Sequence, residues 1–186
     1  MKQNIFVKIC SHFFIADINL FASRINKQLP VYVTWFPDPD AFASDAFSFS
    51  WLIYFFPPFS MLNRICQKIE DDKVKKAILI VPFWPTQSWF PKLLEILIDF
   101  PVALPFCNDL LVLTHSQKFY PMNKRKLFLT ACLVSGLTWQ QKAFGMKLQD
   151  SWLILGGNPQ TSSTISAGVN GVFGVVQNKL IPLHRL

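Results

Sequence analysis

The chain has 186 residues, of which 51% are hydrophobic, and its formal net charge is +7. This length suits one domain, or one domain with an extension, and it is sufficient to bury a hydrophobic core. The 19 Phe and 6 Trp argue against disorder of the whole chain, and the 13 Pro argue against a long helical bundle. The positive charge favours a nucleic-acid partner, but the basic residues are scattered, which is also typical of a solvated surface.

The cysteines and histidines are dispersed along the chain. Four Cys without paired spacing indicate buried free thiols in a reducing compartment rather than a zinc site or a disulfide scaffold. Three widely separated His leave no cluster of metal ligands, so we expect no metal.

No segment has the length and composition of a membrane span. The longest apolar stretch, residues 47–62, is shorter than the ~20 residues that a span requires, and it contains Pro57-Pro58. Acidic residues interrupt the apolar stretch at 93–113, and polar residues interrupt the one that follows the N-terminal lysines. We therefore expect no membrane partner, no signal peptide and an intracellular location, in the cytoplasm or the nucleus.

The first third of the chain alternates between strand and turn signals. Residues 1–14 show no clear period, and we interpret them as an upstream remnant. Runs rich in β-branched and aromatic residues predict strands at 15–22, 31–35 and 52–56. Apolar residues at helical spacing predict a helix that Ser60 caps and that ends near Lys73.

The middle of the chain continues this alternation. Residues 77–83 form a continuous apolar run, as in a central strand that is covered on both faces. Thr86 is a candidate N-cap for the next helix, and strand-like pieces follow at 100–104 and 109–114. Such alternation predicts an α/β fold with at least partly parallel pairing.

The pattern changes after Pro121. We expect helices at 124–135 and 137–149, then a Gly-, Ser- and Thr-rich linker and a short strand-like segment at 174–182. The predicted fold is a small, incomplete Rossmann-like sheet with flanking helices at 15–120. A helical extension at 121–150 and a flexible tail at 151–186 complete the prediction.

Three segments end predicted strands in small, polar or Pro residues: 17–23, 52–60 and 77–86. In an open α/β sheet, ligands bind outside the carboxyl ends of the strands. The residues at these strand ends are therefore the candidates for a site.

The order of the motifs is similar to that of the phage-type Dam N6-adenine methyltransferases. In sequence order they are Asn19-Leu-Phe-Ala-Ser23, Asn26-Lys-Gln-Leu-Pro-Val-Tyr32, Asp45-Ala-Phe-Ser-Phe-Ser-Trp51, Phe56-Pro-Pro-Phe59 and Val81-Pro82. The resemblance implies a methyltransferase-like domain in which S-adenosylmethionine is the cofactor. It places cofactor-binding positions at Asp17, Asn19, Ala22, Ser23 and Asp45, and catalytic positions at Phe56, Pro57, Pro58 and Phe59.

A second resemblance covers most of the chain. The segments Trp35-Phe-Pro-Asp-Pro39, Asp45-Ala-Phe47, Pro57-Pro-Phe-Ser60 and Pro82-Phe-Trp-Pro-Thr-Gln-Ser-Trp89 resemble part of DIRS-like retrotransposon polyproteins. That part lies downstream of the reverse transcriptase and RNase H of those polyproteins. The resemblance implies that these two enzymes are partners within the same polyprotein, and no polymerase motif occurs in this chain itself.

Two departures from the methyltransferase pattern bear on activity. Asn19 stands where the family has an acidic residue, and Phe56 stands where it has Asp or Asn before the two prolines. A phenyl ring makes no conventional hydrogen bond to an adenine amine, and losing a positioned polar group costs several kcal/mol in a transition state. We therefore expect an inactive domain that needs no cofactor and that acts as a scaffold or contacts nucleic acid.

Two further functional hypotheses stay open. One is an active or residual S-adenosylmethionine-dependent DNA N6-adenine methyltransferase that uses Asp17 or Asp45 for the cofactor. The other is a degraded genomic relic without function.

Other candidate residues have structural explanations. Trp84, Trp89 and Phe90 are suited to base stacking, but helix packing explains them as well. Asp38 and Asp40 are a pair of carboxylates, yet between prolines we expect them to be turn residues.

Overall fold

The computed structural model describes residues 1–34, 37–44, 53–106, 110–111, 127–152 and 171–186. The expected strand at 109–114 and the linker after residue 156 lie largely outside this set. Asp45 lies outside it as well.

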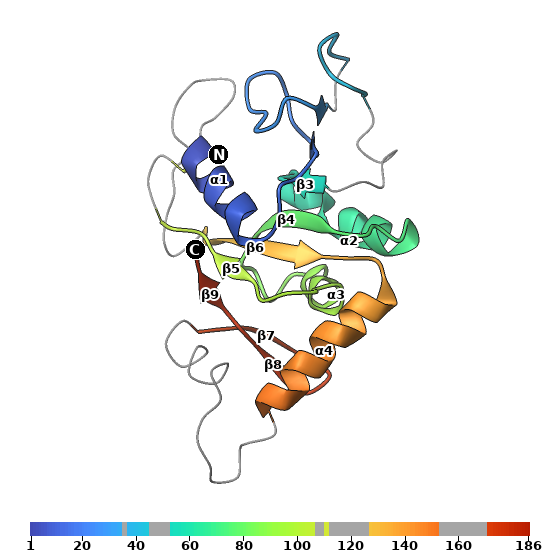
Figure 1. Ribbon diagram of the computed structural model, residues 1–186, viewed down its shortest axis with the longest axis vertical. Coiled ribbons are helices and arrows are strands. Elements are labelled where there is room, and N and C mark those ends of the chain that lie inside the picture. Colours follow the sequence, from blue (N-terminus) through green and yellow to red (C-terminus); the bar gives the residue numbers. More distant parts are fainter. Residues whose placement is uncertain (35–36, 45–52, 107–109, 112–126, 153–170) are drawn as a thin grey trace.

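The described residues form a mixed α/β structure (Figure 1). In chain order the elements are α1 (Gln3–His12), β1 (Ile18–Leu20), β2 (Tyr32–Val33), β3 (Ile53–Phe55), a 3-10 turn (Phe59–Met61), α2 (Leu62–Asp71), β4 (Ala77–Pro82), α3 (Phe90–Glu95), β5 (Val102–Ala103), β6 (Leu129–Val134), α4 (Thr138–Trp152), β7 (Val172–Val176), β8 (Lys179–Pro182) and β9 (His184–Arg185).

Seven strands form the main sheet, in the order β2-β1-β3-β4-β6-β5-β9. Strands β2, β1, β3 and β4 pair in parallel, and so do β5 and β9, whereas β6 is antiparallel to both of its neighbours. Strands β7 and β8 form a separate antiparallel hairpin. The two central residues of its turn, Gln177 and Asn178, have φ of 47° and 61°, which is the left-handed backbone that tight hairpin turns require.

The two faces of the sheet bury different helices. Alternate residues of a strand point to opposite faces, so Ile53 and Phe55 pack in one cluster with the apolar residues of α2 and α3. Tyr54 points the other way, into a cluster with Phe6 and the other apolar residues of α1. Figure 1 shows α1 on one side of the sheet and α2, α3 and α4 on the other.

The expected strands at 15–22, 31–35, 52–56, 77–83 and 100–104 are confirmed as β1 to β5, with narrower bounds. The expected helices at 60–73 and 137–149 are confirmed as α2 and α4.

Both predicted N-caps were wrong. Ser60 lies in the 3-10 turn that precedes α2, and the helix begins without a side-chain cap. Thr86 lies in a turn, and α3 begins only at Phe90, after Trp89. Prolines follow β3 (Pro57 and Pro58) and end β4 (Pro82), and in both places the chain forms a turn before it enters the helix.

The prediction that residues 1–14 lack a period was wrong, because Gln3–His12 form the helix α1. Ile5, Phe6, Ile9 and Cys10 recur at helical spacing and are all buried in α1. Their packing against Tyr54 gives this short helix the tertiary contacts that it needs for stability.

The predicted helix at 124–135 was also wrong, because residues 129–134 form β6. All six residues of β6 are buried, and each pairs with a residue of β4. A continuous apolar run has the same appearance in a buried helix and in a central strand. Here the run forms a strand because it pairs with the hydrogen-bonding edge of β4. The main sheet thus includes β6 and β9, which come from the segments that we expected to be an extension and a tail.

Gly136 marks a close backbone approach after β6. A Cβ atom at this position would lie 1.9 Å from the carbonyl oxygen of Ile69, at the end of α2. The backbone N–H of Gly136 also donates to the Val74 carbonyl at 2.8 Å. Two backbone segments therefore leave no room for a side chain here.

We predict that Gly136→Ala lowers the free energy of unfolding by about 3 kcal/mol or more, because overpacking here displaces backbone. The matched control is Gly145→Ala, where the nearest atom lies 3.7 Å from the added Cβ in the middle of α4. We expect that control to gain about 0.5–1 kcal/mol, as alanine does over glycine in a helix. Urea denaturation measures both, and equal stability of the two variants would contradict the packing described here.

Candidate functional site

The carboxyl ends of β1 and β3 define the candidate site. After β1 the chain forms β2 on one side of it, and β3 then pairs on the other side. The strand order therefore reverses between β1 and β3. At such a point the loops diverge and leave a crevice outside the strand ends, where ligands bind in open α/β sheets.

A cavity of about 490 Å³ lies at this point. Its walls come from the strand ends, from the loop after β1 and from the N-terminal residue. The described residues that line it are Met1, Asn19, Phe21, Ala22, Asn26, Gln28, Tyr54, Phe56, Pro57, Pro58, Phe59, Leu111 and Leu127.

One wall of the cavity is built from side-chain amides. Asn19 is 3% exposed, and its Oδ1 accepts a hydrogen bond from the backbone N–H of Gln28 at 2.9 Å. Its Nδ2 donates to the Leu20 carbonyl at 3.2 Å. Asn19 and Tyr54 are register partners in β1 and β3, so both side chains point to the α1 face of the sheet.

A second part of the cavity lining is apolar and aromatic. β3 ends at Phe55, and Phe56, Pro57 and Pro58 carry the chain directly into the 3-10 turn. The rings of Phe56 and Phe59 lie 6.4 Å apart, and Phe59 meets Trp84 edge to face at 5.3 Å. These contacts place three aromatic side chains at the carboxyl ends of β3 and β4.

The backbone is strained where β1 ends. Phe21 has a φ of 58°, a left-handed conformation that is rare for a bulky residue. It allows the chain to turn sharply, so that the N–H of Ala22 donates to the Val33 carbonyl at 3.1 Å. Strain of this kind gathers at ligand sites, and Phe21 itself lines the cavity.

The structure brings together some of the predicted cofactor positions. Asn19 and Ala22 line the cavity. Ser23 sits in the adjoining turn, where its N–H donates to Asn26 Oδ1 at 2.6 Å, and it does not line the cavity. Asp17 is exposed before β1, at the end of that strand remote from the cavity. Asp45 lies outside the described residues.

All four predicted catalytic positions, Phe56, Pro57, Pro58 and Phe59, line the cavity. Gln28, Tyr54 and Met1 also line the cavity, although the sequence motifs do not mark them as site residues. Tyr54 could have been found from its alternation with Ile53 and Phe55, because a polar group between two core residues must face the other side of the sheet. Nothing in the sequence links Met1 to this site.

Trp89 and Phe90 pack in the core, 5% and 3% exposed, so helix packing explains them. Asp38 and Asp40 are turn residues, as expected: the N–H of Asp40 donates to Asp38 Oδ1 at 3.1 Å.

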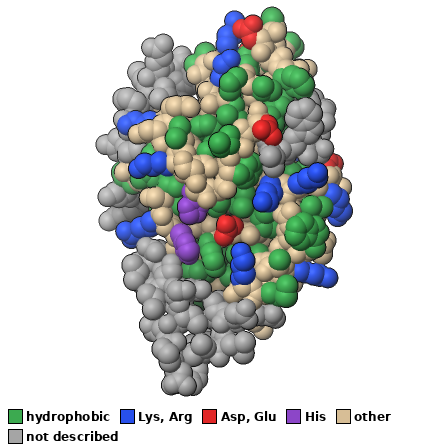
Figure 2. Space-filling view, in the orientation of Figure 1, with side chains coloured by type: hydrophobic (Ala, Val, Ile, Leu, Met, Phe, Trp, Pro, Cys, Tyr) green, Lys and Arg blue, Asp and Glu red, His purple; other side chains and the backbone are tan. Residues whose placement is uncertain are grey.

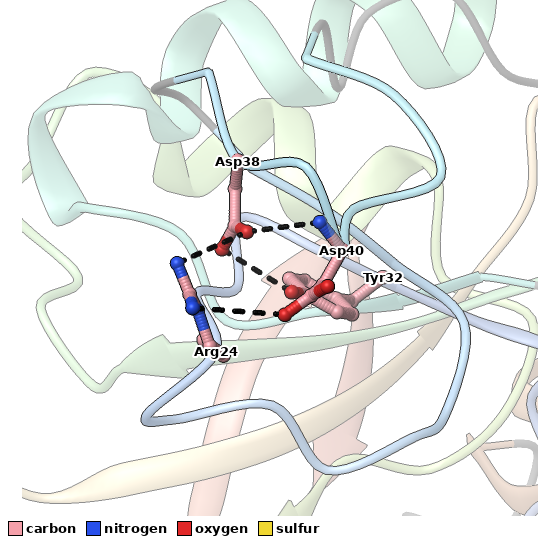
Figure 3. Close-up of polar contacts among 4 residues, drawn as sticks. All are labelled: Arg24, Tyr32, Asp38 and Asp40. Carbon is pink, nitrogen blue, oxygen red and sulfur yellow. Dashed lines mark hydrogen bonds and ion pairs between the residues drawn. The ribbon is translucent and has the colours of Figure 1, made fainter.

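An ionic cluster joins the loops that follow β1 and β2 (Figure 3). Arg24 points toward Asp38 and Asp40, with nitrogen–oxygen distances of 3.5 and 3.7 Å. The hydroxyl of Tyr32 donates to Asp38 Oδ2 at 3.2 Å. The cluster therefore holds the Asp38 loop against the loop that carries the amide wall.

The Asp40 N–H, followed by the charge of Arg24 and the Tyr32 hydroxyl, lowers the pKa of the Asp38 carboxyl below its ordinary value. Desolvation, reinforced by the hydrogen bond to Asp38, raises the pKa of Tyr32.

The described residues hold no group of three or more His, Cys, Asp or Glu side chains that could bind a metal ion. Cys66 and Cys132 are buried, and burial raises the pKa of Cys66 to about 12 and that of Cys132 well above the ordinary thiol value. Reactive thiolates are therefore not expected at these two positions.

No helix among the described residues is long and apolar enough to cross a membrane. On the face shown in Figure 2, Lys and Arg side chains are spread among acidic and apolar ones rather than gathered over one element.

Among the described residues that line the cavity, none has a charged side chain, and Met1 brings its α-amino group to the same lining residues. Amides and a phenol hydrogen-bond a polar ligand edge, and the aromatic wall packs against a flat ring. Comparison of the chain with family models, curated proteins and solved structures found no match.

We predict that Asn19→Ala lowers the free energy of unfolding by about 1–3 kcal/mol, because it leaves the Gln28 N–H without its buried partner. Asn19→Asp keeps the acceptor but loses the donor to the Leu20 carbonyl, so burial raises the pKa of the new carboxyl. Its stability then falls as the pH rises above about 4, the pKa of an unfolded Asp. The control is Asn63→Asp, at an exposed position of α2. Urea unfolding at pH 4 and pH 7 measures the free energy of unfolding of both variants. An equal change with pH in the two variants would contradict the buried, hydrogen-bonded role of Asn19.

We predict that Asp38 titrates below the ordinary range of an aspartate, as followed by carbon NMR of its carboxyl. Arg24→Gln raises this pKa only partway, because the larger contribution, the Asp40 N–H, remains. Since the folded pKa is the lower one, the associated stability is complete above about pH 4 and is lost as the pH falls through the folded pKa. The control is Lys8→Gln, which removes the same charge from α1. An equal rise of the Asp38 pKa in that variant would contradict the contribution of Arg24 to the cluster.

Proposed function

We propose that this chain is a segment of a retrotransposon polyprotein and that it carries a methyltransferase-like domain that no longer transfers methyl groups. The domain acts as a scaffold beside the reverse transcriptase and RNase H of the same polyprotein, or it contacts nucleic acid. The two sequence resemblances motivate this assignment.

The position and lining of the cavity carry the proposal. It lies where the strand order reverses, and two motif segments meet there, one containing Ala22 and one containing Pro57, Pro58 and Phe59. Such a meeting point is where the ligand of a Rossmann-like sheet binds. We infer from this that the sheet is a Rossmann-like variant, with β6 as an antiparallel insertion.

The same cavity argues against catalysis. Phe56 contributes a ring where the family has a polar side chain, and the Asn19 amide is already engaged in two hydrogen bonds. Removing one positioned polar group lowers the rates of enzymes by about 10²–10³. Two such losses at one site favour a non-catalytic domain over an active enzyme.

The described lining also does not fit the cofactor of the family. S-adenosylmethionine carries a sulfonium centre and a charged amino-acid end, and both gain from ionic or strongly polar partners. No charged side chain lines the described part of the cavity, and Asp17 is at the far end of β1. We therefore propose that the domain works without this cofactor.

A methyl-transfer assay tests the proposal directly. We expect the purified chain to transfer no labelled methyl group from S-adenosylmethionine to adenine-containing DNA, because no polar side chain precedes Pro57 to hold the amine. A phage-type Dam enzyme in the same assay is the positive control. N6-methyladenine above the protein-free background, or micromolar binding of S-adenosylmethionine by calorimetry, would contradict the proposal.

A further inference from the structure

A second cavity, of about 570 Å³, lies apart from the candidate site. Its lining comes from the C-terminal ends of α2 and α3, from α4 and from the hairpin of β7 and β8, and it shares no described residue with the lining of the first cavity. Figure 1 shows α4 beside this hairpin, on the side of the sheet remote from α1. The volume lies within the range of cavities that hold small organic ligands.

The inner part of the second cavity is apolar. Leu94, Leu97, Phe144 and Leu148 line it, and each of them is at most 8% exposed. These side chains come from α3, from the segment that follows it and from α4. Covering such a surface with apolar groups of a ligand removes apolar area from water, which is favourable. The described lining therefore favours a ligand with apolar side chains.

Gly145 leaves one wall of the second cavity open. It lies in the middle of α4, where glycine is less favourable than alanine. An added Cβ atom would lie 3.7 Å from Lys179 Nζ, which is an ordinary contact distance, so packing does not explain the glycine. The same Nζ donates to the Gly145 carbonyl at 3.1 Å. This hydrogen bond holds the Lys179 ammonium group at the open wall.

The second cavity carries charges of both signs. Glu95, Lys142 and Lys179 line it from α3, α4 and β8. Glu95 and Lys142 are exposed and make no ion pair or hydrogen bond with other described residues. Glu70 also lines the cavity, but Lys92 pairs with it at 3.1 Å. One carboxylate and two ammonium groups are therefore available to a ligand.

The place of Glu95 in its helix adds to this argument. It is the last residue of α3, and a carboxylate at the C-terminal end of a helix is unfavourable for the helix itself. A ligand cation next to Glu95 offsets this cost, because it is attracted both by the carboxylate and by the free carbonyl groups of the last turn.

We propose that the second cavity binds short apolar peptides with free ends. The peptide ammonium group pairs with Glu95, its carboxylate pairs with Lys142 and Lys179, and its side chains pack against the apolar inner part. A ligand with charges of one sign only would meet a like charge in this lining. The inference goes beyond the proposed function, because it concerns a different cavity.

Calorimetry with two peptides tests the role of the charged ends. Leucyl-phenylalanine has a free ammonium group and a free carboxylate, whereas N-acetyl-leucyl-phenylalanine amide has the same side chains without either charge. We expect the full chain to bind the free dipeptide about tenfold more tightly, because each exposed ion pair contributes a few-fold in affinity. Equal affinity for the two peptides, or binding of neither, would overturn the inference.

Two variants test the partners of the peptide ends. Glu95→Gln and Lys142→Gln each remove one charge at an exposed position, and we expect each to bind the free dipeptide about threefold more weakly and the blocked peptide unchanged. The matched control is Lys147→Gln, at an exposed position of α4 outside the cavity lining. An unchanged affinity in both cavity variants, or an equal loss in the control, would contradict the proposed pairing.

The location of the peptide is measured in the wild-type chain. Met146 lines the second cavity and Met1 lines the first. With labelled methionine methyl groups, saturating leucyl-phenylalanine should shift the NMR signal of Met146 and leave that of Met1 in place. A Met146 signal that does not move at saturation would show that the peptide does not bind in the second cavity.

Discussion

The pairing of β4 with β6 is the interaction on which the sheet depends. It joins six residue pairs, from Ala77 with Val134 to Pro82 with Leu129, and it is the longest ladder among the described strands. On one side of it lie β2, β1 and β3, and on the other lie β5 and β9. All residues of β4 and β6 are buried, so these two strands form the centre of the core. The strands that form the cavity pack beside this centre and depend on it.

The ladder also explains why the cavity has walls from distant parts of the chain. Because β6 runs antiparallel to β4, its first residues lie at the same edge of the sheet as the last residues of β3 and β4. Leu127 precedes β6 and so reaches the cavity that Phe56 and Pro57 line from β3. One antiparallel strand thus brings the second half of the chain to a site that the first half begins.

The sequence was informative where local signals and tertiary structure agree. Alternating or continuous apolar runs identified β1 to β5, and the strand-end segments led to Ala22 and to Phe56–Phe59 at the cavity. The sequence was uninformative where a long-range contact decides between helix and strand. The apolar run of β6 fits a helix as well as a strand, and only its partner β4 selects the strand.

The candidate site shows the same division between local and long-range signals. Motif order predicted which strand ends form the site, because each motif is a local feature of the chain. The amide wall could not be predicted, since it depends on a contact from Asn19 to Gln28 and on one from Gln28 to Met1. Such hydrogen bonds join residues that no spacing rule relates.

The position of β9 bears on how the chain folds. Val102 and Ala103 of β5 pair in parallel with His184 and Arg185, which lie near the other end of the sequence. Pairing of this kind must close a long loop before any contact is gained, so it is slow compared with helix or hairpin formation. During synthesis that edge of the sheet stays without its outer neighbour until residues 184–185 have left the ribosome, and an unpaired edge is prone to aggregation.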